Sequence, residues 1–369
     1  ADMDVTRATD ATRVDENGLI ADVLSNVPRI DYTGGGCPHI LAEPQRTNVV
    51  TYSEDFTQWT KSNASLINTI TSTVISPDGV SYANKLYPIG TGGYIKQTIA
   101  GDCFSIFVKK GERKWILIYG GFANSNVWFD SENGVLGTVK SEATATVESF
   151  GNDWYRIKIL WTQNSTQVRI YNTDNDNTLV STGNGTDGLY IWGAQLEAGS
   201  YATSYIPTTG STVTRNQDQF TRDGIGSLIN STEGVLFVEM AALENGGSNR
   251  VISLSDETND NLIFIRFDNT VSRIYGFMRG SGGSYKTLVV NNVNQTNNNK
   301  IALVWDATNV RLWVNGVESV SSSINDLPVG MSNLSLTNPT GGDILFGKVK
   351  QLQVYDTALT DTQLAALTS

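Results

Sequence analysis

Short apolar or alternating runs, separated by turn residues, recur along most of the chain. Before residue 210 they include SIFVKK, KWILIYGG, NVWFD, WYRIKILW and QVRIYN, and after residue 232 GVLFVEMAAL, NLIFIRFD, SRIYGFMRG and ILFGKVKQLQVYD follow the same pattern. Runs of this length at close spacing are typical of antiparallel sandwiches rather than of parallel sheets covered by helices. The chain is therefore predicted to be all-β, with two tandem antiparallel jelly-roll β-sandwiches.

The distribution of these runs predicts four parts. Residues 1–50 are expected to form an N-terminal arm or linker with extended pieces, and residues 51–210 the first sandwich. Residues 211–231, which are polar and rich in turn formers, are expected to link it to a second sandwich at residues 232–369. The only convincing helix is short and C-terminal, where Thr360 and Gln363 have the spacing of a capping box.

Two local patterns predict how the strands connect. Asn133 and Gly134 predict a two-residue hairpin turn, because both residue types accept the positive φ that such turns require. The segments WTQNSTQVRIYN (residues 161–172) and WDATNVRLWVNG (residues 305–316) have similar patterns, in which a strand ends at a polar turn and a second strand returns. This likeness predicts related architectures for the two sandwiches.

Composition and charge exclude several classes of partner. The chain has 369 residues, of which 39% are hydrophobic and only 17% charged, and its formal net charge is −11. An acidic surface repels phosphate backbones and anionic lipid, so we expect no nucleic-acid partner. No apolar run approaches the roughly 20 residues of a membrane span, so we expect no membrane insertion either.

Histidine and cysteine usage also restricts the chemistry. His39 is the only histidine, so a site that needs two imidazoles is excluded, and its glycine-flanked segment is a poor place for a preorganised base. Cys37 and Cys103 are too few for a disulfide scaffold or a thiolate zinc site. Two free thiols are the favoured prediction, and a single disulfide between them remains the alternative.

Glycan hydrolysis on a sandwich needs two carboxylates on one face. Glu239 and Glu244 are five residues apart, which places them on opposite faces of a strand, so no catalytic residues are assigned. The favoured prediction is a protein without enzymatic activity.

Binding chemistry is better supported than catalysis. In the second sandwich, alternation predicts that one strand face carries Arg273, Tyr275, Phe277 and Arg279, with Arg266 joining from a neighbouring strand. Aromatic rings offer flat surfaces to sugars, and arginines offer forked donors that suit an acidic glycan. The alternative is a solvated outer face or a domain interface.

The first sandwich offers a second candidate platform. Trp115 and Tyr119 share one face of their strand, and Trp128 alternates with the apolar residues on either side of it. These three aromatic side chains are candidates for stacking on sugar rings. The alternative is that they fill the interior of the sandwich.

Several segments resemble a known family of proteins. ENGLIADVLSNVPRIDY followed by LAEPQRTNVVTYSEDFTQW resembles an N-terminal signature of bacteriophage and prophage tail-type structural proteins. GNDWYRIKILW and GLYIWGAQLEAGSYATSYIPT resemble the end of the carbohydrate-binding-module-like jelly roll that accompanies this signature. Residues 232–369, with VRLWVNGV and QLQVYDTALTDTQLAAL, resemble a concanavalin A-like lectin/glucanase domain of the laminin-G type.

The resemblance implies a virion surface protein, extracellular, such as a tail or head fibre component that adheres to host cell-surface polysaccharide. Its other partners would be virion proteins and further copies of itself, with a trimer favoured. Two alternatives remain at this stage, namely a polysaccharide depolymerase (a lyase or a hydrolase) and a purely architectural virion component. No cofactor is implied with certainty.

The resemblance also raises calcium as a candidate structural ion. Jelly rolls similar to the first domain often hold an ion near their first and last strands, where Glu54, Asp55 and Asp187 would supply carboxylates.

Overall fold

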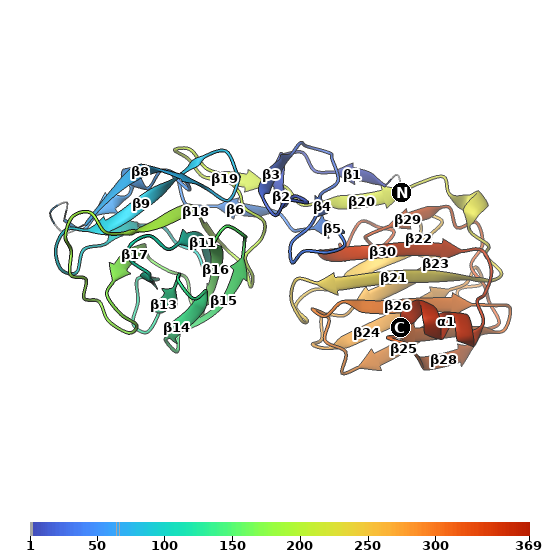
Figure 1. The fold of residues 1–369 in the computed structure, drawn as a ribbon. Coiled ribbons are helices and arrows are strands. Elements are labelled where there is room, and N and C mark those ends of the chain that lie inside the picture. The colour runs from blue at the N-terminus through green and yellow to red at the C-terminus, as the bar shows by residue number, and fades with distance from the viewer. Residues whose placement is uncertain (1–2, 64, 66) are drawn as a thin grey trace. The chain divides into compact units, whose positions relative to one another are not determined.

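The chain divides into two units in the computed structural model, which describes residues 3–63, 65 and 67–369 (Figure 1). Unit 1 comprises Leu24–Pro44 and Asn216–Ser369 together with the chain up to Ala8, and unit 2 comprises Thr9–Val23 and Gln45–Arg215. Among the described residues, all paired β-strands run antiparallel to each other. The single α-helix of this part of the chain is short and C-terminal. The predicted all-β class with antiparallel sandwiches is confirmed.

Unit 2 contains two sheets of six strands. The first has the order β15 (Ala143–Ser149), β16 (Trp154–Trp161), β11 (Cys103–Lys109), β18 (Leu189–Glu197), β9 (Tyr82–Pro88), β8 (Ile67–Ile75). The second has the order β14 (Val135–Val139), β13 (Val127–Asp130), β12 (Trp115–Tyr119), β17 (Val168–Thr173), β10 (Ile95–Gln97), β7 (Thr60–Lys61). Smaller elements are the pairs β2 (Ala11–Val14) with β3 (Ile20–Val23) and β6 (Arg46–Asn48) with β19 (Val213–Arg215), and the 3-10 helix η1 (Phe56–Gln58).

Unit 1 contains two sheets of seven strands. The first has the order β1 (Asp4–Thr6), β20 (Gln219–Arg222), β29 (Asn333–Ser335), β22 (Arg250–Ser255), β23 (Leu262–Phe267), β24 (Arg273–Arg279), β25 (Tyr285–Asn291). The second has the order β28 (Val317–Ser323), β27 (Asn309–Val314), β26 (Asn299–Trp305), β21 (Gly234–Ala242), β30 (Gly347–Tyr355), β5 (His39–Ala42), β4 (Ile30–Asp31). The remaining helical elements are η2 (Gly226–Leu228) and α1 (Asp361–Thr368).

Period-2 alternation explains the two cores. In unit 2, Ile116 and Ile118 of β12 enter the core between the sheets, whereas Leu117 between them joins a separate cluster on the other face. In unit 1, Ile274 and Met278 of β24 enter the core in the same way. Each sheet therefore has one face in the core and leaves the other available for further contacts.

The expected N-terminal arm consists of extended pieces, but these pieces are strands of the two units. β1 pairs with β20, and β5 pairs with both β4 and β30 in unit 1, whereas β2, β3 and β6 belong to unit 2. The expected linker at residues 211–231 likewise carries β19, β20 and η2, and the division between units falls after Arg215. Strands of two to four residues with mixed polarity show no clear alternation, which is why the sequence pattern did not reveal them.

The hairpin predicted at Asn133 and Gly134 is wrong in its length. Strands β13 and β14 are joined by the four residues 131–134, of which only Gly134 has a positive φ, of 68°. The longer loop forms because Asp130 Oδ1 accepts hydrogen bonds from the backbone N–H groups of Glu132 at 2.9 Å and Asn133 at 3.3 Å. A two-residue turn occurs instead between β27 and β28, where Asn315 and Gly316 both have positive φ.

The similar segments 161–172 and 305–316 connect their strands differently. β26 and β27 are neighbours in one sheet of unit 1, so the second segment is a hairpin. β16 and β17 lie in different sheets of unit 2, so the first segment crosses between sheets. The sequence likeness therefore does not reflect a shared connection.

The predicted C-terminal helix is confirmed with its capping box. The Thr360 side chain accepts a hydrogen bond from the N–H of Gln363, whose side chain accepts one from the N–H of Thr360. Helix α1 lies over the sheet that contains β26 (Figure 1), and Leu364 is fully buried against residues of β21 and β26. Across the described residues, no helix is long and apolar enough to cross a membrane.

Candidate functional site

The predicted arginine-bearing face is assembled by β23, β24 and β25 of unit 1. The strand register places Arg266 opposite Tyr275, and Phe264 opposite Phe277. Tyr285 of β25 lies opposite Arg279. We call this surface the arginine face, and it comprises Phe264, Arg266, Arg273, Tyr275, Phe277, Arg279 and Tyr285.

A row of stacked rings crosses the arginine face. The ring centres of Phe264 and Phe277 are 4.7 Å apart with an angle of 11° between the planes, and those of Phe277 and Tyr285 are 5.9 Å apart at 21°. Rings stacked in this way cover each other's faces, so a sugar can reach only the outermost ones. Tyr285, which is 65% exposed, is the most accessible ring of the row. Phe264 and Tyr285 were not among the predicted residues, because alternation within one strand reveals neither the pairing of β25 with β24 nor the stacking of rings across strands.

Two of the three predicted arginines share one buried counter-charge. Asp268, whose side chain is almost fully buried, accepts hydrogen bonds from the guanidinium groups of Arg266 and Arg273. Burial opposes ionisation of Asp268, but hydrogen bonds from the Thr270 N–H and from Arg273 outweigh it and lower its pKa. These two arginines are therefore held in place by an internal ion pair.

Arg279 is the arginine most available to a ligand. Its side chain is 36% exposed. Its Nη2 lies 3.2 Å from Oδ1 of its ion-pair partner Asp260, whose side chain is 72% exposed. An ion pair this open to solvent is weak, so an anionic ligand can compete with it. The three arginines and the two carboxylates, Asp260 and Asp268, leave one net positive charge on this face.

The aromatic residues predicted in the first sandwich lie outside its core. Trp115, Leu117 and Tyr119 face away from the core residues Ile116 and Ile118, and they cluster with Trp128 on the outer side of the sheet. The alternative that they fill the interior of the sandwich is therefore excluded. Trp128 is only 2% exposed and donates from Nε1 to the Thr178 carbonyl at 2.9 Å, so its ring is not open to a ligand.

A tyrosine pair around an arginine completes this outer cluster. The guanidinium carbon of Arg169 lies 4.6 Å from the ring centre of Tyr94 and 5.0 Å from that of Tyr119. Arg169 and Tyr171 reach the same face because β17 pairs with β12, which places Tyr171 opposite Leu117. Alternation within β17 puts Arg169 and Tyr171 on one side of the strand, but it does not reveal the pairing with β12 or the contact with Tyr94.

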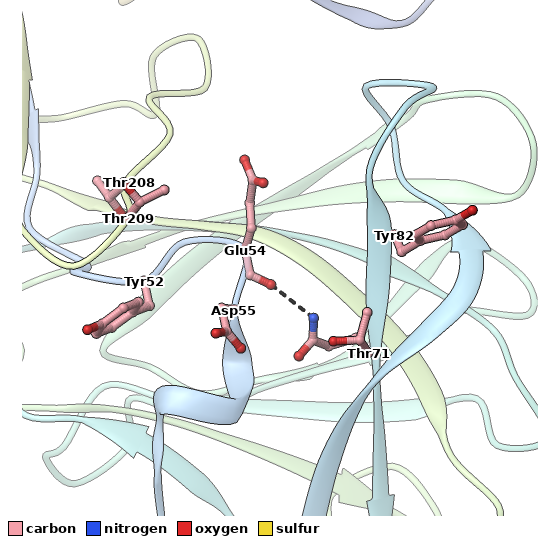
Figure 2. A pocket seen from close by; sticks show the side chains of 8 residues that line it. Tyr52, Glu54, Asp55, Thr71, Tyr82, Thr208 and Thr209 are labelled. Atoms are coloured by element: carbon pink, nitrogen blue, oxygen red, sulfur yellow. Dashed lines mark hydrogen bonds between the residues drawn. The ribbon is translucent and has the colours of Figure 1, made fainter.

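The carboxylates predicted to bind calcium take separate places in unit 2. Glu54 and Asp55 line a pocket of about 340 Å³ together with Tyr52, Thr71, Tyr82 and Asn84 (Figure 2). Asp187 does not line this pocket and accepts a hydrogen bond from Thr186 in its own loop. The described part of the chain contains no group of three histidine, cysteine or acidic residues suited to a metal ion. Calcium binding stays a prediction.

Burial gives Glu54 an unusual environment. Loss of solvent, with smaller contributions from the charges of Asp78 and Asp22, raises the pKa of Glu54. The Tyr205 hydroxyl donates to Glu54 Oε1 at 2.9 Å and partly opposes this shift. Burial also raises the pKa of Tyr205 well above its usual value, so the phenol stays protonated as the donor.

The remaining reactive residues have structural surroundings. Both cysteines are free thiols, with Cys37 exposed and Cys103 buried, and burial raises the pKa of Cys103 to about 12. Glu239 accepts hydrogen bonds from the amides of Asn298 and Gln351, whereas Glu244 pairs with Arg250 at 2.8 Å. The two glutamates thus do not share one site.

One family model matches the chain. The model of the concanavalin A-like lectin/glucanases superfamily matches residues 236–365, a segment that includes the whole arginine face. Comparison with the curated proteins finds no match.

The search of solved structures also finds matches, of which three follow. The chain is 19% identical to the Ruminococcus gnavus IT-sialidase CBM40 bound to α2,3-sialyllactose, covering 38% of this chain and 84% of that one at a TM-score of 0.33. It is 10% identical to domains LG4-5 of the mouse laminin α1 chain. This match covers 85% of this chain and 91% of the laminin chain, with a TM-score of 0.28. It is 12% identical to the SAP-like pentraxin of Limulus polyphemus. This match covers 38% of this chain and 72% of the pentraxin chain, with a TM-score of 0.33.

Proposed function

We propose that the protein binds cell-surface polysaccharide without cleaving it, as an extracellular component of a virion tail or head fibre. The lectin/glucanase family match over residues 236–365 supports sugar binding by unit 1. The virion role rests on the resemblance of the N-terminal segments to phage tail-type proteins, and the same resemblance favours a homotrimer that contacts other virion proteins.

The observation that carries the binding proposal is the open end of the arginine face. Tyr285 offers the most exposed ring of the stacked row, and the neighbouring Arg279 offers guanidinium donors with only a weak, exposed partner. A ring that stacks on a sugar beside a forked donor for its carboxylates or hydroxyls is suited to an acidic polysaccharide.

A double variant, Arg279→Ala with Tyr285→Ala, tests this proposal. A glycan array would first identify a bound polysaccharide, and retention on that polysaccharide is then expected to fall at least tenfold without a change in Tm. Arg311→Ala is the matched control, because it removes an arginine from the other sheet of unit 1. Unchanged retention of the double variant would show that the arginine face does not bind the polysaccharide.

The same material separates the competing functions. Shorter polysaccharide chains on size exclusion after incubation with the protein would establish a depolymerase instead. An array without any bound glycan would favour a purely architectural component, whose aromatic faces contact other virion proteins.

A further inference from the structure

The pocket beside Glu54 is formed where the β8–β9 hairpin becomes irregular. Thr71 of β8 lies opposite Asn84 and Ile75 lies opposite Tyr82, so the register shifts between these two pairs. Such bulges bend a strand and redirect its side chains. Here the irregular segment borders a pocket whose volume of about 340 Å³ is in the range of small-molecule sites.

The pocket contains a buried acceptor without a donor. Asn84 is 3% exposed, and its Nδ2 donates to the Glu54 carbonyl at 3.0 Å (Figure 2). Its Oδ1 is buried and accepts no hydrogen bond. Buried acceptors are normally satisfied, so this oxygen indicates a donor that is supplied from outside the chain.

The charges around the pocket have one sign. Glu54 and Asp55 line it, Asp78 and Asp22 add to the negative field at Glu54, and none of the described lining residues is a lysine, arginine or histidine. Glu54 Oε1 accepts from Tyr205, whereas Oε2 accepts no hydrogen bond from the described residues. A positively charged donor would supply the missing counter-charge.

We propose that this pocket binds a small polyol that carries a protonated amino group, of the amino-sugar class. An ammonium group has three donors and no acceptor, which complements a lining of carboxylate and amide oxygens. The rings of Tyr52 and Tyr82 border the same space, and aromatic rings attract both cations and sugar faces. The hydroxyls of the sugar supply the further donors.

The arrangement of the two carboxylates favours such a ligand over a bare metal ion. In Figure 2 the side chains of Glu54 and Asp55 point in different directions, so their oxygens do not converge on one point. Asp55 is also engaged by Thr57, whose N–H donates to Oδ1 at 3.0 Å. A metal ion needs convergent ligands, whereas a molecule with separated donors reaches both sides of the pocket.

Calorimetric titration of the full chain with glucosamine and with N-acetylglucosamine tests the proposal. At a pH below the pKa of its amine, glucosamine carries a positive charge on its nitrogen, whereas the amide nitrogen of N-acetylglucosamine is neutral. Glucosamine is expected to bind at least tenfold more tightly than N-acetylglucosamine. Equal affinities, or no binding of glucosamine, would overturn the proposal.

Two variants assign the binding to this pocket. Glu54→Gln keeps an acceptor for Tyr205 but removes the charge, and glucosamine affinity is expected to fall at least tenfold. Tyr82→Ala removes a ring that is 53% exposed, so it leaves the fold intact, and a loss of at least threefold is expected. Asp187→Asn is the control, because it removes a carboxylate of the same unit outside the pocket.

The variants also identify the outcomes that contradict the proposal. Wild-type affinity in both Glu54→Gln and Tyr82→Ala would place glucosamine elsewhere on the chain. Calcium chloride gives the other contradicting outcome. If calcium binds the wild type, displaces glucosamine, and binds more weakly to Glu54→Gln, the pocket is a metal site instead of an amine site.

Discussion

The guanidinium carbon of Arg266 lies 4.4 Å from the centre of the Tyr275 ring, and that of Arg273 lies 5.1 Å from the same ring. Because Asp268 holds both arginines, the ring is fixed between two ordered cations. Tyr275 is therefore part of the scaffold that orders the arginine face, and its contact with a sugar stays a prediction.

Tyr275→Ala is expected to lower the free energy of unfolding by about 2 kcal/mol, since it removes a half-buried ring and two cation–π contacts. Tyr275→Phe keeps the ring and is expected to stay within about 0.5 kcal/mol of the wild type. Urea unfolding of both variants measures the difference. Equal stability of Tyr275→Ala and the wild type would show that the ring has no part in holding the two arginines.

The sequence predicted what depends on local alternation. The shared face of Arg273, Tyr275, Phe277 and Arg279 follows from period 2 within one strand, and the structure has it. The strand pairings that bring Tyr285 beside Phe277 are not local, and alternation within single strands does not specify them.

Turn prediction shows the same limit. Asn133-Gly134 and Asn315-Gly316 are the same dipeptide, yet only the second forms a two-residue turn. The difference comes from Asp130, whose side chain captures the N–H groups that follow it and lengthens the first loop. The pocket was beyond prediction for a similar reason, because Glu54 and Asn84 meet only after β9 pairs with β8 and β18.

The stability of unit 1 is expected to depend on pH through its only histidine. His39 lies in β5 and is 5% exposed. Burial, followed by the positive charge of Lys348, lowers the pKa of His39 to about 4. These effects outweigh Asp31, whose Oδ1 lies 3.3 Å from His39 Nε2, and Lys350 adds to them.

A histidine whose pKa is lower in the folded state takes up its proton more readily when unfolded. The free energy of unfolding is therefore expected to fall as the pH decreases from about 6.5, the usual histidine pKa, toward about 4. The slope from this one group cannot exceed about 1.4 kcal/mol per pH unit. His39→Gln removes the titration, so its stability relative to the wild type should rise over this interval in urea unfolding at several pH values. A constant difference would assign the pH dependence to the carboxylates alone.

Asp218 is the centre of a buried ion cluster that joins distant parts of the sequence within unit 1. Its Oδ1 accepts from Arg7 at 2.8 Å, its Oδ2 accepts from Arg29 and from the Glu43 N–H, and Arg29 also donates to the Glu43 carboxylate at 2.7 Å. The side chains of Arg7, Arg29 and Asp218 are fully buried. The cluster thus ties two N-terminal arginines to a carboxylate far from them in sequence, which explains why the N-terminal strands of unit 1 do not form a free arm.

Asp218→Asn keeps the size of the side chain but leaves Arg7 and Arg29 with less counter-charge in a buried site, and a loss of about 3 to 5 kcal/mol in the free energy of unfolding is expected. Asp260→Asn is the control, since it removes the exposed partner of Arg279, and it should change stability by less than about 0.5 kcal/mol. Chemical unfolding followed by tryptophan fluorescence measures both. If Asp218→Asn lost no more than the control, the cluster would not be what holds the N-terminal strands in unit 1.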